Sequence, residues 1–108
     1  MNAAAKKEIV SKHTNVTTSN WTDISNTHGA NDIIVITDII CGNNTGSSTV
    51  QFAGYDGSTR TNFLVINTAS DRNENLHFRT PIHLSEGSRI QINTSAPNAY
   101  ITINYYVI

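Results

Sequence analysis

The sequence predicts an all-β fold: an antiparallel, jelly-roll-like β-sandwich of about eight strands with a short N-terminal arm. Three observations predict it. Short runs of β-branched and aromatic residues recur at spacings of roughly ten residues. Turn-forming segments separate them, among them CGNNTGSS (41–48), YDGS (55–58) and SEGS (85–88). Asn, Thr and Ser make up about a third of the chain, and these residues favour turns and strands over helices.

The length of 108 residues corresponds to one domain. We expect residues 13–108 to form the sandwich and residues 1–12 to form the arm. The arm contains the only segment with helical character, AAAKKE, which is too short to be a stable isolated helix. A first strand within residues 8–12 is the alternative.

The strands are expected in a simple order along the chain. A weak strand surrounds Trp21 and Ile24, and stronger ones follow at 31–40, 48–56, 58–67, 75–80, 81–84, 88–95 and 99–108. Their alternating pattern places apolar side chains on one face of each strand. The residues expected in the core are Ile34, Ile36, Phe52, Phe63, Ile90, Ile92, Ile101 and Ile103.

The C-terminal strand, AYITINYYVI, has two different faces. Ile101, Ile103, Tyr105 and Val107 form an apolar face that should line the core, while the other face has a polar centre and apolar ends. An apolar strand at a sheet edge invites aggregation, so we expect this strand to be central and paired on both sides.

The composition argues against several classes of partner. The net charge is −1, without the basic face that a nucleic-acid-binding protein needs. No run approaches membrane-spanning length, and residues 1–20 lack the apolar core of a signal peptide. Cys41 is the only cysteine, so an intrachain disulfide is impossible, and we expect this residue to pack in or near the core. The expected compartment is the cytosol, or a particle assembled in it.

No motif points to catalysis, a cofactor or a metal. The four histidines (His13, His28, His77 and His83) form no H-x-H pair. Asp71, Asn73 and Asn75 have the spacing of the first calcium-loop ligands, but Leu76 and Ile82 occupy the discriminating glycine and glutamate positions. We therefore assign no catalytic, metal-binding or cofactor-binding residue and expect a protein that is not an enzyme.

Asp38 interrupts the apolar run IIVITDII. Three alternatives stay open at this stage: a half-buried carboxylate paired with an arginine, a β-bulge, or the end of the strand. No second carboxylate stands at a readable spacing from it.

The segment TPIHLSEGSRIQI…AYITINYYVI resembles the C-terminal half of small jelly-roll proteins in the particles of tailed bacteriophages. The likeness rests on Pro81, Ile82 and Leu84 before the turn at Gly87, and on the two strands that follow. Trp21 followed by Ile24 is also similar, so the resemblance covers roughly residues 20–108. It implies a non-enzymatic virion protein, either a capsid cement or decoration protein or a related fibre or tail module.

The arm is cationic, because Lys6, Lys7 and Lys12 are three of the seven basic residues of the chain. On the decoration-protein hypothesis, these lysines contact the major capsid protein or another virion protein, and Ile9 and Val10 dock beside them. Tyr100, Tyr106 and Ile108, on the outer face of the last strand, are expected to form the interface of a homo-oligomer, a trimer or alternatively a dimer.

The alternative function is a carbohydrate-binding or receptor-binding module, such as a fibre or tail tip. Trp21, Tyr55 and Tyr100 are the aromatic residues that would stack on sugar rings. Their packing within the fold would explain them equally well.

Overall fold

The computed structural model describes residues 8–16, 19–25, 28–43, 46–68, 72–95 and 99–108. These residues form eight strands: β1 (Val10–Val16), β2 (Thr22–Asp23), β3 (Ile34–Asn43), β4 (Ser48–Tyr55), β5 (Arg60–Thr68), β6 (Arg72–His83), β7 (Arg89–Thr94) and β8 (Ala99–Val107). No helix occurs among the described residues. The predicted all-β class and the predicted number of strands are confirmed.

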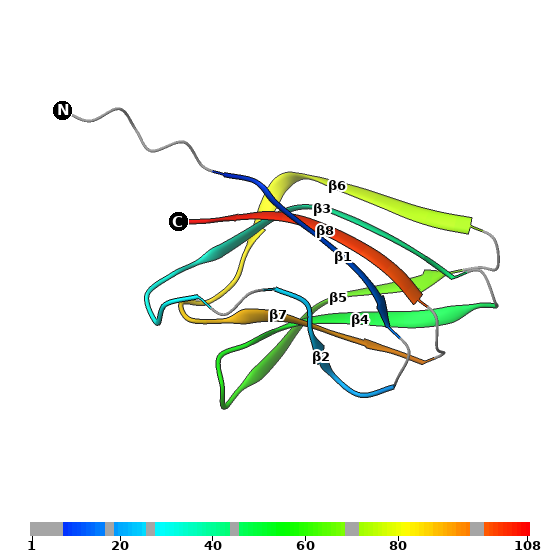
Figure 1. Cartoon of the computed structure of the whole chain (residues 1–108), viewed down its shortest axis with the longest axis horizontal. Helices are drawn as coiled ribbons and strands as arrows, with labels where there is room; N and C mark the ends of the chain where they lie inside the picture. Colours follow the sequence, from blue (N-terminus) through cyan, green and yellow to red (C-terminus); the bar gives the residue numbers. More distant parts are fainter. Residues whose placement is uncertain (1–7, 17–18, 26–27, 44–45, 69–71, 96–98) are drawn as a thin grey trace.

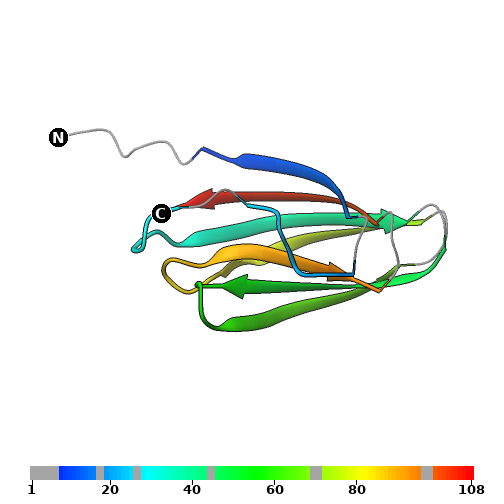
Figure 2. The same ribbon diagram turned by 60° about the horizontal axis from the view of Figure 1, so that its bottom comes forward.

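The strands form two four-stranded antiparallel sheets, in the orders β1-β8-β3-β6 and β2-β7-β4-β5. Within these orders β1 pairs with β8, β2 with β7, β3 with β6 and β4 with β5. Such nested pairs arise when a long hairpin is rolled up, and they define a jelly roll. Figure 1 and Figure 2 show the two sheets as layers facing each other.

The core lies between the two layers. Seven of the eight residues predicted for the core are buried, and the eighth, Phe63, is only partly buried. Phe63 lies on β5, at the edge of its sheet, and packs against Phe52 with ring centroids 6.3 Å apart. Burial of Phe63 was overestimated because an alternating pattern does not reveal that a strand lies at an edge.

Strand β8 has the position and orientation that its sequence predicted. It lies between β1 and β3, and Ile101, Ile103 and Tyr105 are buried on its inner face. Tyr100 is exposed on the outer face, and Thr102, Asn104 and Tyr106 are half-buried there.

The predicted boundary at residue 12 is wrong, because β1 begins at Val10. Val10 packs against the core and is opposite Tyr105, and Lys12 is opposite Ile103. Both residues therefore belong to the sandwich rather than to an arm. Lys6 and Lys7 lie outside the described residues.

Strand β6 also differs from the prediction, since one strand replaces the two expected at 75–80 and 81–84. Its pairing with β3 is interrupted: His77 is opposite Asp38, whereas Ile82 is opposite Ile36. Pro81 lies in this irregular stretch. Proline is tolerated there because β6 is an edge strand and its missing N–H breaks no ladder.

Candidate functional site

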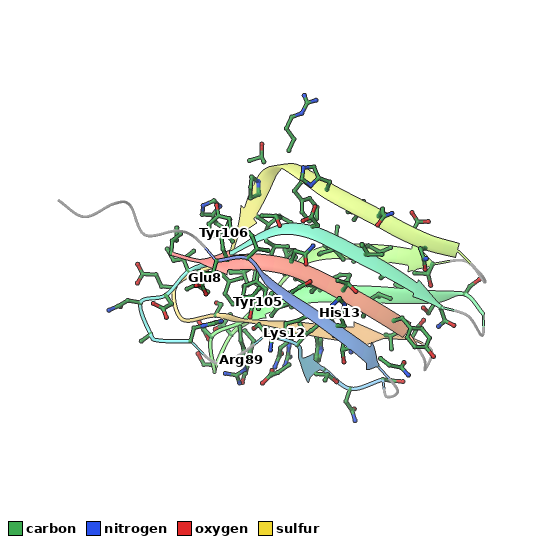
Figure 3. The ribbon with its side chains drawn as sticks, turned by 45° about the horizontal axis from the view of Figure 1, so that its top comes forward. Glu8, Lys12, His13, Arg89, Tyr105 and Tyr106 are labelled. Carbon is green, nitrogen blue, oxygen red and sulfur yellow. The ribbon has the colours of Figure 1, made fainter. Side chains whose placement is uncertain are left out.

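One face of the β1-β8-β3-β6 sheet points away from the core, and we call it the outer face. It has the features of an interaction surface. The structure describes five exposed large apolar side chains (Ile9, Ile40, Val65, Tyr100 and Ile108), and Val65 alone lies on the opposite sheet. Figure 3 shows β1, β8, β3 and β6 in front of the second sheet, with His13 on β1 and Tyr106 on β8. The sequence alone did not reveal this grouping, because Ile40 and Ile9 belong to segments far from β8.

A row of polar side chains crosses the middle of this face and links all four strands. The Ser11 hydroxyl donates to Asn104 Oδ1 at 2.5 Å, and Asn104 Nδ2 donates to Asp38 Oδ2 at 3.4 Å. Asp38 Oδ1 lies 2.5 Å from His77 Nδ1, and the Thr37 hydroxyl also donates to Asp38 at 2.9 Å. The row joins the strands laterally and gives this carboxylate three side-chain hydrogen-bond partners.

The structure settles the open alternatives for Asp38. Against β8 the register of β3 shifts by one residue between Ile36 and Asp38, so Thr37 is the extra residue of a bulge. The partner of Asp38 is a histidine and not an arginine. The hydrogen bond from His77, with further ones from Thr37 and Asn104, keeps the pKa of Asp38 below its usual value despite some desolvation.

One end of the outer face is apolar. Ile108 exchanges two backbone hydrogen bonds with Ile33, and Tyr106 is opposite Val35 in the register. Ile9 directly precedes β1, and extending the β1–β8 register by one residue sets it beside Tyr106. Ile9 is 58% exposed and Ile108 is 49% exposed. We call these three residues (Ile9, Tyr106 and Ile108) the apolar end.

Tyr100 lies at the other end of the face, six residues from Tyr106 along β8, which is roughly 20 Å in a strand. The three residues predicted for the homo-oligomer interface therefore lie at the two ends of the outer face, with Tyr100 at one end and Tyr106 and Ile108 at the other. The structure groups Tyr106 and Ile108 with Ile9, a residue predicted for a different role, and separates Tyr100 from them.

Tyr100 borders a shallow hollow of about 460 Å³, which His13, Asn15, Ile40, Asn73 and Thr102 also line. His13 Nδ1 and the Thr102 hydroxyl are hydrogen-bonded at 2.8 Å, which fixes one wall. A second hollow of about 230 Å³ adjoins it across Ile40 and includes Asp38, Asn75 and His77.

The opposite sheet carries a cluster of stacked arginine and aromatic side chains. The Arg60 guanidinium lies 4.7 Å from the Trp21 ring centre and 4.9 Å from that of Tyr55, and Arg89 lies 4.8 Å from Tyr55. Gln91 accepts from Arg60 Nε at 2.9 Å and donates to Asp23 at 2.6 Å, and Asp23 pairs with Arg89 at 3.0 Å. Two of the three aromatic residues considered for sugar stacking are therefore half-buried and already cover guanidinium groups.

The candidate metal ligands are dispersed over the structure. His13 and His77 lie on the outer face in different rows, His83 contacts the Pro81 carbonyl oxygen at 3.3 Å, and His28 packs edge-on against Tyr105. Among the described residues no group of three or more His, Cys, Asp and Glu side chains is arranged to hold a metal ion. Asp71 of the calcium-like spacing lies outside the described residues, and Asn73 and Asn75 lie in β6.

Cys41 is buried, as predicted. Burial, with a smaller contribution from Glu74, raises the pKa of its thiol to about 11. Within the part of the chain that the structure describes, no helix has the length and apolar character needed to cross a membrane.

Comparisons with known proteins identify no relative by sequence: no family model matches the chain, and no curated protein matches it. Among solved structures, the chain is similar to a chain from Bacillus endospore appendages, described as a novel family of disulfide-linked pili. The identity is 16%, the alignment covers 98% of this chain and 94% of the other, and the TM-score is 0.46. No functional conclusion rests on this similarity.

Proposed function

We propose that this chain is a non-catalytic structural protein that works in many copies, as a cement or decoration protein on the head shell of a bacteriophage. Its partners are copies of itself and the major capsid protein. The observation that carries the proposal is the apolar end, where Ile9, Tyr106 and Ile108 meet on one face. The sequence predicts partner binding for Ile9 and self-association for Tyr106 and Ile108.

Removing water from the outer face costs little free energy, and a surface of this kind suits a protein contact. Its middle row satisfies Asp38 internally through His77, Asn104 and Thr37. Exposed apolar side chains at the end of such a face gain roughly 25 cal/mol for each Å² that they bury. No new charge pairing is needed when this end is covered.

The size of the face argues for assembly through many weak contacts. Four strands about 4.8 Å apart and about seven residues long cover on the order of 400 Å². A stable interface buries about 800 Å² on each partner, so this face alone gives a weak pairwise contact. Repetition over a lattice multiplies such contacts into firm attachment, which is how a cement protein works.

The self-association part is tested by sedimentation velocity over a concentration series. Wild-type protein should form a closed oligomer, a trimer or alternatively a dimer. The double variant Ile9→Ser/Ile108→Ser should shift this equilibrium toward monomer. Val65→Ser is the matched control, because Val65 is 52% exposed but lies on the opposite sheet. Monomer at every concentration, or equal effects of the two changes, would contradict self-association through the apolar end.

The shell part needs a separate experiment. Phage particles from the cells that produce this protein would be purified, and its copy number would be measured by mass spectrometry and its position by electron microscopy. We expect many copies on the head surface. Absence from the particles, or a few copies at the tail tip, would contradict the decoration role.

A further inference from the structure

The hollow beside Tyr100 has the chemistry of a sugar-binding site, and we propose that it binds a neutral oligosaccharide. This proposal does not rest on the assembly role, because the hollow lies at the end of the outer face that is remote from the apolar end. The argument rests on the shape of the hollow, on its aromatic wall and on the side chains that border it.

The shape follows from the residues in register at this end of the sheet. Asn15, Tyr100, Gly42 and Asn73 occupy one row across β1, β8, β3 and β6. Gly42 adds no side chain to this row and is itself buried, so the hollow is bordered by Asn15, Tyr100 and Asn73 together with residues of the next row. From β1 to β6 the row spans three strand spacings, about 14 Å, and the hollow that it borders has a volume of about 460 Å³.

The Tyr100 ring provides an apolar platform. Tyr100 is 47% exposed, unlike Trp21 and Tyr55, which are half-buried against arginines. Ile40 in the next row extends the apolar floor beside it. A flat ring with an adjacent aliphatic side chain fits the C–H face of a pyranose, which is apolar and flat on that side.

The polar border of the hollow fits hydroxyl groups. Asn15 and Asn73 line this hollow and Asn75 the adjoining one, and within the described residues their side-chain amides make no hydrogen bond to another protein group. Each amide offers two donors and one acceptor, the combination that a hydroxyl can meet in either role. Asn15 and Asn73 lie on opposite sides of Tyr100, so a sugar on the ring would lie between them.

The charge of the site selects a neutral ligand. Among the residues that line the larger hollow none is an aspartate, glutamate, lysine or arginine, and His13 is hydrogen-bonded to Thr102. The described lining residues therefore include no cation that could pair with a carboxylate or sulfate. Asp38 in the adjoining hollow would repel an acidic sugar.

Saturation-transfer NMR tests the proposal on the whole chain. The probes are the neutral tetrasaccharides of glucose, mannose and N-acetylglucosamine, with trigalacturonate as the acidic comparison. At least one neutral probe should receive saturation and shift the backbone amide signals of Asn15, Tyr100 and Asn73, and trigalacturonate should not. No transfer to any neutral probe, or preference for the acidic one, overturns the proposal.

Two tyrosine variants on the same strand and face locate the site. Tyr100→Ala should weaken binding by about tenfold or more, since an aromatic anchor dominates a small contact, and Tyr100→Phe should retain most of it. Tyr106→Ala is the matched control and should bind as the wild type does. Asn73→Ala, at an exposed position, gives a second variant if Tyr100→Ala unfolds, and it should weaken binding severalfold. Equal binding by Tyr100→Ala and wild type, or shifts confined to the Trp21 and Tyr55 signals, overturns the assignment.

Discussion

Asp38 shows how much of this structure depends on single side chains. Its carboxylate is 2.5 Å from His77 Nδ1 and completes a row of hydrogen bonds over four strands. The sequence shows that Asp38 interrupts an apolar run, but it does not identify the partner of the carboxylate, because His77 stands 39 positions away along the chain. Only the β3–β6 register brings the two residues together.

This arrangement predicts a pH-dependent contribution of Asp38 to stability. Its folded-state pKa is below the usual value, so the contribution is fully present above about pH 4, near the unfolded-state pKa. It is lost as the pH falls through the lowered folded-state pKa. Asp38→Asn should therefore unfold at a lower temperature than wild type at pH 7, and the difference should shrink below pH 4. A difference that stays constant from pH 7 to pH 2.5 would contradict this account; both proteins would be followed by circular dichroism.

Cys41 should be unreactive in the folded protein. Its thiol is buried and has a pKa raised to about 11, so roughly a thousandth is thiolate at pH 8. Labelling with a disulfide reagent should be slow in buffer and rapid in denaturant. Rapid labelling without denaturant would show that β3 opens readily at this point.

At the scale of strands, the alternating pattern predicted which face of a strand points to the core, but it did not predict which strands lie at the edges of a sheet. The inner and outer faces of β8 were predicted correctly because its alternation is strict from Ile101 to Tyr105. The pattern gave no information on which strands lie at the sheet edges. The partial exposure of Phe63 on β5 and the continuity of β6 through Pro81 were therefore missed.

Because β1 is an edge strand, we expect Lys12 to protect the protein against aggregation through this edge. Its side chain is on the inward-facing row of β1, opposite Ile103, where a charge discourages pairing with another chain. Lys12→Ile should change thermal stability little, by about 0.5 kcal/mol or less, but should increase aggregation on heating. Light scattering measures this, with Lys12→Arg as the charge-preserving control. Equal aggregation of Lys12→Ile and Lys12→Arg would contradict this protective role of the charge.

The arginine cluster connects β4, β5 and β7 with β2 across the second sheet. Arg60→Ala removes its contacts with Trp21, Tyr55 and Gln91, and should lower the free energy of unfolding by about 1–2 kcal/mol. Urea denaturation followed by the fluorescence of Trp21, the only tryptophan, measures this. Arg79→Ala, an exposed change on β6, is the control and should have no effect. A similar loss in both variants would mean that the stacking contributes nothing specific.

For the whole molecule, the nested strand pairs explain why the sequence predicted the class of fold and not the surface. Turn signals and strand count suffice for a sandwich, because both are local. The outer face carries Ile9 from the residue before β1, Ile40 from β3 and Tyr100 from β8. Such a face is set by register between distant segments, which a single sequence does not display.

The first strand also determines where the chain can be shortened. Deleting residues 1–7 removes Lys6 and Lys7 but leaves β1 intact, so the unfolding temperature should not change. Deleting residues 1–12 removes Val10 from the core and leaves Ile103, Asn104 and Tyr105 without their β1 partners. We expect a loss of about 2–4 kcal/mol, from the ladder hydrogen bonds and the lost apolar contact.

Chemical denaturation of the two truncated proteins measures the difference directly, and light scattering reports the exposed edge of β8. The newly uncovered part of β8 is apolar on its inner face, so the shorter protein should also aggregate more readily. Equal stability of both truncated proteins would show that Val10 to Lys12 contribute nothing to the sandwich, and the domain boundary would return to residue 12. If the protein lacking residues 1–7 is stable and the one lacking residues 1–12 is not, shell binding can be tested without Lys6 and Lys7 while Ile9 and the fold remain in place.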